Sequence, residues 1–373
     1  YGVLTGLFAE RCAHVTVTDR RDENLVVNEQ RNSSADNISY IKEIDWKKED
    51  HRASYDLVVL ESSRPDMDLK VVVKEASQYV KQGGRLVFAC ENALGLCFLS
   101  GAVHDEDESA FTKGELEAAF REAGLETVEF YYPMPEYKRA QTVYSDRYLP
   151  GKGDIPHVTA VYDRQRIHED EISDKLVQEK AFGLFANAYL AVASKEQEPF
   201  DTIFAKYNRT RKPQFQIRTR ILEENGKRYV EKAALTEASG AHIGSMEEKH
   251  EKLSKVNPEV RVLEPHFSED KQAVRFEFLT GKTLAEELGG QIQGKKAPVE
   301  AIQAAMEQVF SKAALRPESF YVTPEFLEVF GRDPAEDSQD SAPGELEQQL
   351  SALSDASYAV SNIDGLFENL MVS

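Results

Sequence analysis

Two continuous apolar runs constrain the fold of this chain more than any other feature. They are Tyr55-Asp-Leu-Val-Val-Leu60 and Arg85-Leu-Val-Phe-Ala89. Apolar runs of this length, without polar alternation, are typical of strands buried on both faces of a parallel sheet. A helix pattern over Leu69–Lys81 joins them and ends at the turn Gln82-Gly-Gly84. Strand, crossover helix and strand together predict an open, doubly wound α/β sheet.

The same alternation of strand and helix patterns runs from the start of the chain to about residue 195. The further strands expected there are His14–Thr18, Ile38–Glu43, Leu125–Tyr132 and Asn187–Ser194, and the further helices are Glu23–Arg31, Thr112–Ala123 and a first helix with an apolar face at Val3, Leu4, Leu7 and Phe8. Thr112 is the expected N-cap of its helix, with Glu115 as the partner in a capping box.

From Phe200 onward the pattern changes to strands interrupted by one helix. The expected strands are Ile203–Tyr207, Phe215–Glu223, Lys227–Leu235, Val260–Glu264 and Ala273–Leu279, with a hairpin turn at Glu224-Asn-Gly226, a helix over 241–255 and a later helix at Pro298–Ala314. The acidic, Ser- and Pro-rich stretch 333–349 is predicted to be a mobile loop. We therefore expect two domains, residues 1–196 and 197–373, of which the second has an α+β fold.

Composition excludes several classes of function. The formal net charge of −20 argues against general nucleic-acid binding, which needs a basic surface. Three cysteines make no disulfide framework, and the scattered histidines give no zinc spacing. No apolar run reaches about 18 residues, so we expect no direct membrane insertion. A cytoplasmic location is the expectation that fits these features.

The first residues have the order of a nucleotide-binding unit. A glycine turn at Gly2, a helix, a strand and the terminal acid Asp19 follow one another, as in the middle of a βαβ unit. Gly2 would let the backbone approach a ligand, Asp19 would accept ribose hydroxyls, and Asp45 and Trp46 would flank an adenine. Alternatively, Asp19 is a polar strand end and Trp46 a half-buried surface aromatic. We expect the first strand of this unit to lie upstream of Tyr1, in a longer protein.

The segments YDLVVL and KQGGRLVFA resemble class I S-adenosylmethionine-dependent methyltransferases. The segments FTKGELEAAFREAGLETVEFYYPMPEYK and TVYSDRYLPGKG resemble bacterial proteins in which a methyltransferase domain precedes a kinase-like domain, including those that cap O-antigen chains. The resemblance implies a Rossmann-like methyltransferase sheet. It also implies two catalytic acids at strand ends, Glu61 and Glu91, for which the alternative is a helix cap or a loop acid. The residues that it implies for S-adenosylmethionine binding are Gly2, Val3, Asp19, Arg20, Asp45 and Trp46.

The last residues, SNIDGLFENLMVS, resemble the catalytic loop of protein kinases. Asp364 and Asn369 have the spacing of the catalytic base and of the asparagine that holds Mg²⁺, and Lys232 stands where a third strand would grip ATP phosphates. The chain departs from the pattern in two ways. No glycine-rich loop precedes Lys232, and Asn362-Ile363 replaces His-Arg. The chain also ends before any second metal-binding acid, so we expect the kinase-like domain to be cut short.

The resemblance implies methyl transfer from S-adenosylmethionine to a hydroxyl or phosphate of a cell-surface polysaccharide or its precursor. The partners it implies are a glycan or lipid-linked glycan acceptor and proteins of polysaccharide assembly. Two alternatives stay open. One is kinase-like phosphotransfer with ATP and Mg²⁺ beside a vestigial methyltransferase domain, and the other is a non-catalytic scaffold.

Overall fold

The computed structural model describes residues 2–46, 50–62, 68–102, 109–155, 169–196, 200–256, 260–293, 299–300, 302–304, 315–316, 358–359 and 369–372. Spatial proximity of the backbone divides the chain into two compact units. The first unit comprises Tyr1–Tyr131, Val161–Glu169 and Leu184–Glu198, and the second comprises Tyr132–Ala160, Asp170–Gly183 and Pro199–Ser373. The expected domain boundary between residues 196 and 197 stays a prediction.

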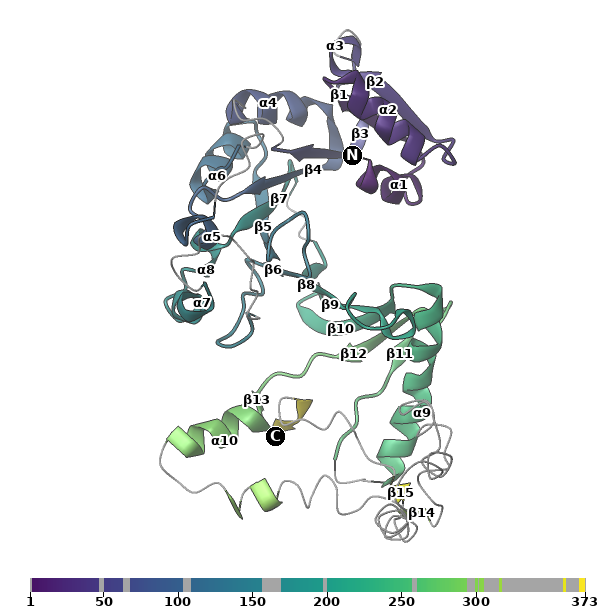
Figure 1. The fold of residues 1–373 in the computed structure, drawn as a ribbon, viewed down its shortest axis with the longest axis vertical. Coiled ribbons are helices and arrows are strands. Elements are labelled where there is room, and N and C mark those ends of the chain that lie inside the picture. The colour runs from purple at the N-terminus through teal and green to yellow at the C-terminus, as the bar shows by residue number, and fades with distance from the viewer. Residues whose placement is uncertain are drawn as a thin grey trace, which may run out of the picture. The chain divides into compact units, whose positions relative to one another are not determined.

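The main sheet of the first unit has the order β3-β4-β7-β5 (Figure 1). Its strands are β3 (Tyr55–Glu61), β4 (Val80–Glu91), β7 (Ala188–Ser194) and β5 (Thr127–Met134). β3 and β4 are parallel, whereas β7 runs antiparallel to both of its neighbours. A separate parallel pair consists of β1 (Val15–Asp19) and β2 (Ile38–Lys42). The first unit is therefore an α/β structure of Rossmann-like connectivity, as predicted.

Helices connect these strands. They are α1 (Val3–Ala9), α2 (Asp22–Arg31), α3 (Glu43–Trp46), α4 (Leu69–Tyr79), α5 (Leu96–Leu99) and α6 (Lys113–Glu122). The core is made by apolar side chains of β4 and α6, where Phe88 and Phe120 are fully buried and meet edge to face at 6.5 Å between ring centroids. The predicted capping box is confirmed: the Thr112 hydroxyl accepts from the Glu115 N–H at 3.3 Å, and Glu115 Oε2 accepts from the Thr112 N–H at 2.8 Å.

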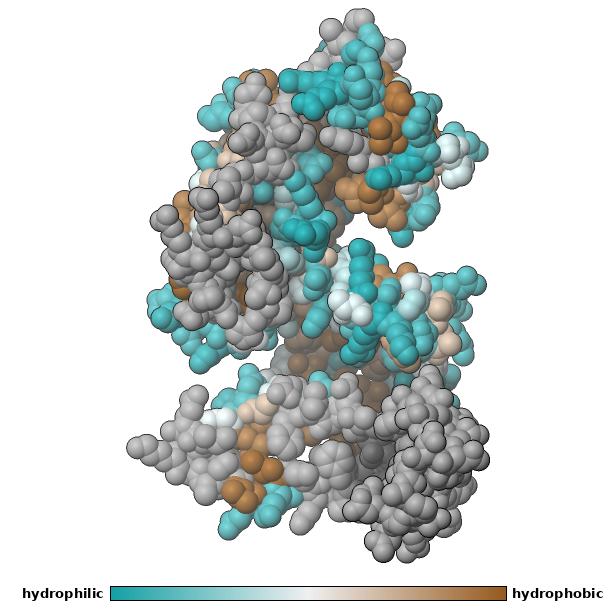
Figure 2. Space-filling model, in the orientation of Figure 1, coloured by the Kyte–Doolittle hydropathy of each residue, from teal (hydrophilic) through white to brown (hydrophobic). Residues whose placement is uncertain are grey.

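Two apolar patterns do not lie where the sequence predicts. β3 was expected to be buried on both faces, but Leu57 and Val59 are 38% and 41% exposed. Both side chains leave the same face of β3, the terminal strand of its sheet, and it is this face that is exposed, whereas Val58 and Leu60 on the other face are half-buried. The apolar face of α1 is also largely exposed, and the residue that α1 buries is Thr5. Figure 2 shows the resulting apolar surface over α1 and α2.

The second unit contains an antiparallel sheet of order β6-β8-β9-β10-β12-β11. Its strands are β6 (Thr142–Ser145), β8 (Thr202–Tyr207), β9 (Ile217–Glu224), β10 (Lys227–Ala234), β12 (Ala273–Glu277) and β11 (His266–Phe267). Helix α9 (Gly240–Val256) follows β10, and its Ile243 and Met246 belong to an apolar cluster with Ile217 and Val274 of the sheet. One face of this sheet is thus covered by α9 (Figure 1).

The remaining elements belong wholly or partly to the second unit, and the helix Phe182–Phe185 is divided between the two units. They are α7 (Glu169–Gln178), α8 (Phe182–Phe185), the 3-10 turns η1 (Pro213–Phe215) and η2 (Glu237–Ser239), β13 (Lys282–Thr283), α10 (Leu284–Gln293), β14 (Leu315–Arg316), β15 (Tyr358–Ala359) and β16 (Met371–Val372).

The hairpin between β9 and β10 is confirmed. Asn225 and Gly226 both have positive φ, 50° and 74°, as a tight two-residue hairpin turn requires. The strand expected at Val260–Glu264 is wrong. The carbonyl of Leu263 lies 3.0 Å from Nδ1 of His250 on α9, and pairing with β12 begins only at β11, after this segment.

Parts of three predictions lie outside the described residues. Of the helix expected at Pro298–Ala314, residues 299–300 and 302–304 are described and are helical. The acidic stretch 333–349 and Asp364 are outside the described residues altogether. In the part of the chain that is described, no helix has both the length and the apolar character needed to cross a membrane.

Candidate functional site

The carboxyl ends of β3 and β4 bring two predicted catalytic acids to one edge of the sheet. In the parallel register Glu61 faces Ala89, and Glu91 lies two residues beyond Ala89 on the same strand. Because side chains alternate between faces along a strand, Glu61 and Glu91 leave the same face of the sheet. This edge is where open α/β sheets bind their ligands. It is therefore the candidate site of the first unit.

Two buried serines were not predicted from the sequence, and one of them, Ser62, directly follows Glu61 at this edge of the sheet. Ser62, directly after β3, and Ser100, directly after α5, are fully buried, and their hydroxyl oxygens have no hydrogen-bond partner in the described structure. A buried polar atom without a partner costs about 1–3 kcal/mol. Such atoms suit a site that receives a polar ligand. The sequence signal for Ser62 is its place directly after Glu61, at the end of an apolar strand.

Asn92 frames the site rather than facing a ligand. Its Nδ2 donates to the carbonyls of Leu184 and Ala186 at 2.9 and 2.7 Å, and the Asn92 side chain is fully buried. Next to it, Oδ1 of Asn187 accepts from the Cys97 N–H at 2.9 Å. These bonds fix the segment after β4 against the start of β7, so the backbone that carries Glu91 is held in place.

Asp19, the acid at the end of β1, is hydrogen-bonded to residues at the start of the following helix. Asp19 accepts from the Arg21 N–H at 2.9 Å through Oδ1 and from Nδ2 of Asn24 at 3.0 Å through Oδ2. Asp19 therefore stabilises the start of α2. Ribose hydroxyls would share these oxygens, each of which keeps a second lone pair.

Of the other residues expected to bind the cofactor, Arg20 and the helix that carries Asp45 and Trp46 adjoin the strand that ends at Asp19. Arg20 donates from Nε to Glu43 at 3.1 Å, so the end of β1 meets α3, which ends at Asp45-Trp46. Gly2 and Val3, at the start of α1, lie near the opposite end of α2 from Asp19. The carbonyl of Gly2 accepts from Nδ2 of Asn32 at 2.9 Å, which puts the start of α1 against the last turn of α2.

In the second unit, Lys232 lies on β10, the third of the consecutive antiparallel strands β8, β9 and β10. It faces Thr219 on β9 and Val274 on β12, so it belongs to the sheet face that α9 covers. Two acids of α9 form solvent-exposed ion pairs, Glu247 with Lys271 at 3.6 Å and Glu248 with Lys252 at 2.5 Å. Burial lowers the pKa of His242 on the same helix, and the charges of Lys249, Arg211 and Lys232 lower it further.

The residues expected to hold Mg²⁺ are only partly described. Asn369 directly precedes Leu370, whose carbonyl accepts from the Leu284 N–H at 2.7 Å, so this end of the chain is attached to α10. Asp364 lies outside the described residues. In the described part of the chain no three His, Cys, Asp or Glu side chains come together as a metal site.

The chain resembles solved structures of methyltransferases over about half of its length. A possible histamine N-methyltransferase from Thermotoga maritima is 15% identical at a TM-score of 0.34, with 52% of this chain and 79% of that chain covered. A putative methyltransferase from Bacillus halodurans is 15% identical at a TM-score of 0.31, with 52% and 89% covered. The N-methyltransferase NodS from Bradyrhizobium japonicum is 16% identical at a TM-score of 0.28, with 52% and 79% covered. No protein-family model matches the chain, and no curated protein matches it.

Proposed function

We propose that the first unit transfers a methyl group from S-adenosylmethionine. The observation that carries this proposal is the order β3-β4-β7-β5, in which the last strand is inserted antiparallel between two strands that run the other way. A reversed last strand of this kind separates class I methyltransferases from other Rossmann-like folds, and Glu61 and Glu91 lie at the edge where such enzymes hold their ligands.

The residues present fit that cofactor in part. Asp19 would accept the ribose hydroxyls, and Asp45 and Trp46 would flank the adenine. Arg20 beside Asp19, and Gly2 and Val3 at the start of α1, are the further residues proposed to contact the cofactor. The cofactor supplies an electrophilic methyl group. The chain supplies Glu61 and Glu91, either of which can take the proton that a hydroxyl loses as its oxygen is methylated.

The proposed acceptor is a hydroxyl or phosphate of a cell-surface polysaccharide or its lipid-linked precursor. Support for it comes from the sequence resemblance alone. The proposal includes a cytoplasmic location and contact with proteins of polysaccharide assembly.

A second candidate function is kinase-like phosphotransfer by the second unit. It is favoured by one specific observation: three consecutive antiparallel strands, helix α9 and two further strands follow one another, with β12 pairing back on β10. This is the order of elements in the nucleotide-binding lobe of protein kinases. Lys232 on the α9 side of the third strand would hold ATP phosphates, Asn369 would hold Mg²⁺, and Asp364 would be the base.

Calorimetric titration separates these functions. S-adenosylmethionine is titrated into the full chain and into the Asp19→Ala and Asp56→Ala variants. Asp56, at the other end of β3, pairs with Lys81 and serves as the matched control. We expect saturable binding that Asp19→Ala weakens and Asp56→Ala leaves unchanged, with thermal melts showing that both variants fold. Binding that ignores Asp19, or none at all, would refute the methyltransferase proposal.

The same protein is titrated with ATP and Mg²⁺, and compared with Lys232→Met. Loss of nucleotide binding in that variant, with S-adenosylmethionine binding retained, would support the kinase-like function. If neither ligand binds, a scaffold is the function that survives.

A further inference from the structure

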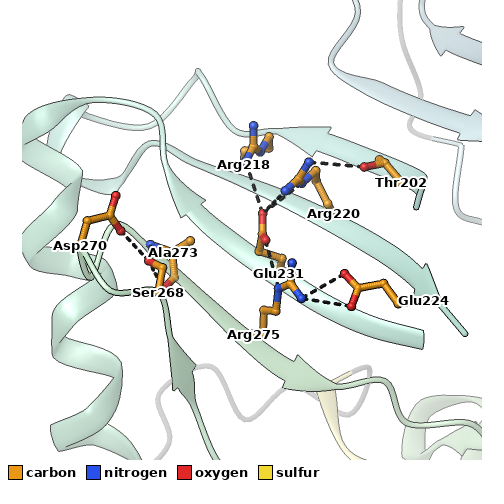
Figure 3. Close-up of polar contacts among 9 residues, drawn as sticks. All are labelled: Thr202, Arg218, Arg220, Glu224, Glu231, Ser268, Asp270, Ala273 and Arg275. Atoms are coloured by element: carbon orange, nitrogen blue, oxygen red, sulfur yellow. Dashed lines mark hydrogen bonds and ion pairs between the residues drawn. The ribbon is translucent and has the colours of Figure 1, made fainter. Parts of the chain in front are cut away.

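Three arginines surround one buried carboxylate on the second unit's sheet (Figure 3). Glu231 on β10 lies directly opposite Arg220 on one neighbouring strand, β9, and directly opposite Arg275 on the other neighbouring strand, β12. Cross-strand partners leave the same face of a sheet, and Arg218 lies two residues before Arg220 on β9, so all four side chains share one face. Lys232 and α9 belong to the opposite face, so this cluster is separate from the proposed nucleotide site.

The contacts within the cluster are uneven. Oε1 of Glu231 accepts from Nε and Nη2 of Arg220 at 3.0 and 2.5 Å, and from Nη2 of Arg218 at 3.3 Å. Oε2 accepts from Nε of Arg275 at 3.4 Å, and Nη1 of Arg275 also donates to Glu224 at 3.0 Å. Arg220 is therefore bound firmly, whereas Arg218 and Arg275 each reach Glu231 through one long contact.

The cluster has more donors than its acceptors can use. Each guanidinium carries five N–H donors, and a carboxylate has about four lone-pair sites. Nε of Arg218 is buried and has no hydrogen-bond partner in the described structure. The Glu231 side chain is only 7% exposed, but those of Arg218, Arg220 and Arg275 are 32%, 28% and 43% exposed. Three arginines against Glu231 and Glu224 leave positive charge at an accessible surface.

The surrounding sequence is basic in an acidic protein. Residues 200–235 contain nine Lys or Arg and four Asp or Glu, whereas the whole chain has a formal net charge of −20. A local excess of positive charge attracts anions, but the acidic remainder of the chain repels a long polyanion. The ligand that fits both facts is a small group with concentrated negative charge.

We propose that this face of the sheet binds a phosphate group, either free or carried by a small molecule such as a sugar phosphate. The cluster defined by Arg218, Arg220, Glu231 and Arg275 is its site. Glu231 and Arg220 form the fixed part and hold the arginines side by side. Arg218 and Arg275 supply the remaining donors, because planar guanidinium groups match phosphate oxygens bidentately and a dianion can bridge the two.

The test is calorimetric titration of the full chain with pyrophosphate, inorganic phosphate and glucose 1-phosphate. Arg218→Gln removes one proposed donor, and Arg261→Gln is the matched control. Arg261 carries the same charge in the same unit, but it pairs on the surface with Glu277. We expect Arg218→Gln to weaken pyrophosphate binding by about tenfold, the loss of one charge-assisted contact, and Arg261→Gln to leave it nearly unchanged.

One further variant keeps the proposal falsifiable. Arg218→Lys retains the charge without the planar fork, so it is expected to fold and to weaken binding if the geometry matters. Stronger binding of glucose 1-phosphate than of inorganic phosphate would identify a sugar phosphate as the ligand, and the reverse would identify free phosphate. Absence of saturable binding, or an equal loss in Arg261→Gln, would overturn the proposal.

Discussion

Gly2 lies directly against Asn28 of α2. A Cβ atom at Gly2 would sit 2.5 Å from Oδ1 and 2.9 Å from Cα of Asn28, and Gly2 has a φ of 77°. Both the conformation and the space at this position therefore require glycine. The glycine that was expected to let a ligand approach has a second, structural reason to be there.

Gly2→Ala is expected to lower the free energy of unfolding by about 2 kcal/mol, because the new methyl group meets backbone as well as side chain and the left-handed conformation is strained. Chemical denaturation followed by circular dichroism measures it. Gly114→Ala in α6 is the control, since a Cβ there has nothing within 4 Å. The interpretation fails if both variants behave alike.

Asn92→Leu is expected to destabilise the first unit by about 2–4 kcal/mol, because the carbonyls of Leu184 and Ala186 lose their donor in a buried place. Hydrogen exchange of the peptides that span β4 and β7 locates the effect. Asn92→Asp adds a pH test: a buried carboxyl donates only when it is protonated, so its destabilisation should shrink as the pH falls. A loss of stability that is independent of pH would contradict the role given to Nδ2.

Thr112→Ala is expected to cost about 1 kcal/mol, because it removes the hydroxyl that caps α6. Thr112→Ser keeps the oxygen and should retain most of the stability. Urea denaturation of the three proteins measures the difference. Equal midpoints for alanine and serine would show that the cap contributes nothing.

Stability of the β9–β10 hairpin should fall in acid. Burial raises the pKa of Glu231, but hydrogen bonds and charge from Arg220, Arg218 and Arg275 outweigh burial and leave the pKa below its ordinary value of 4.5. A carboxyl whose pKa is lowered by folding stabilises the fold above its unfolded pKa, and this contribution is lost as the pH falls through the folded value.

The backbone amides of residues 217–234 should therefore lose protection as the pH falls below about 4.5, as measured by hydrogen exchange corrected for intrinsic rates. The Glu231→Gln variant removes the titrating group and should show a smaller change over that range. An identical acid response in the two proteins would show that other groups control it.

Local structure followed from local patterns. The capping box at Thr112 and Glu115, the turn at Asn225-Gly226 and most strands of both units were predictable, because their physical causes lie within a few neighbouring residues. The same patterns overestimated burial. Leu57 and Val59 read as residues of a central strand, but a strand's apolar character does not say how many partners it has.

The candidate sites depended on the tertiary structure in a different way. The sequence alone determined that Glu61, Glu91 and Asp19 end their strands, that Lys232 lies on a strand after a hairpin, and that the chain is acidic with a basic stretch at 200–235. Only the tertiary structure decided that β7 inserts between β4 and β5, that Asp19 binds the start of α2, and that Arg218, Arg220 and Arg275 converge on Glu231. The physical reason is strand register, which joins residues far apart in the sequence and leaves no periodic trace in either partner.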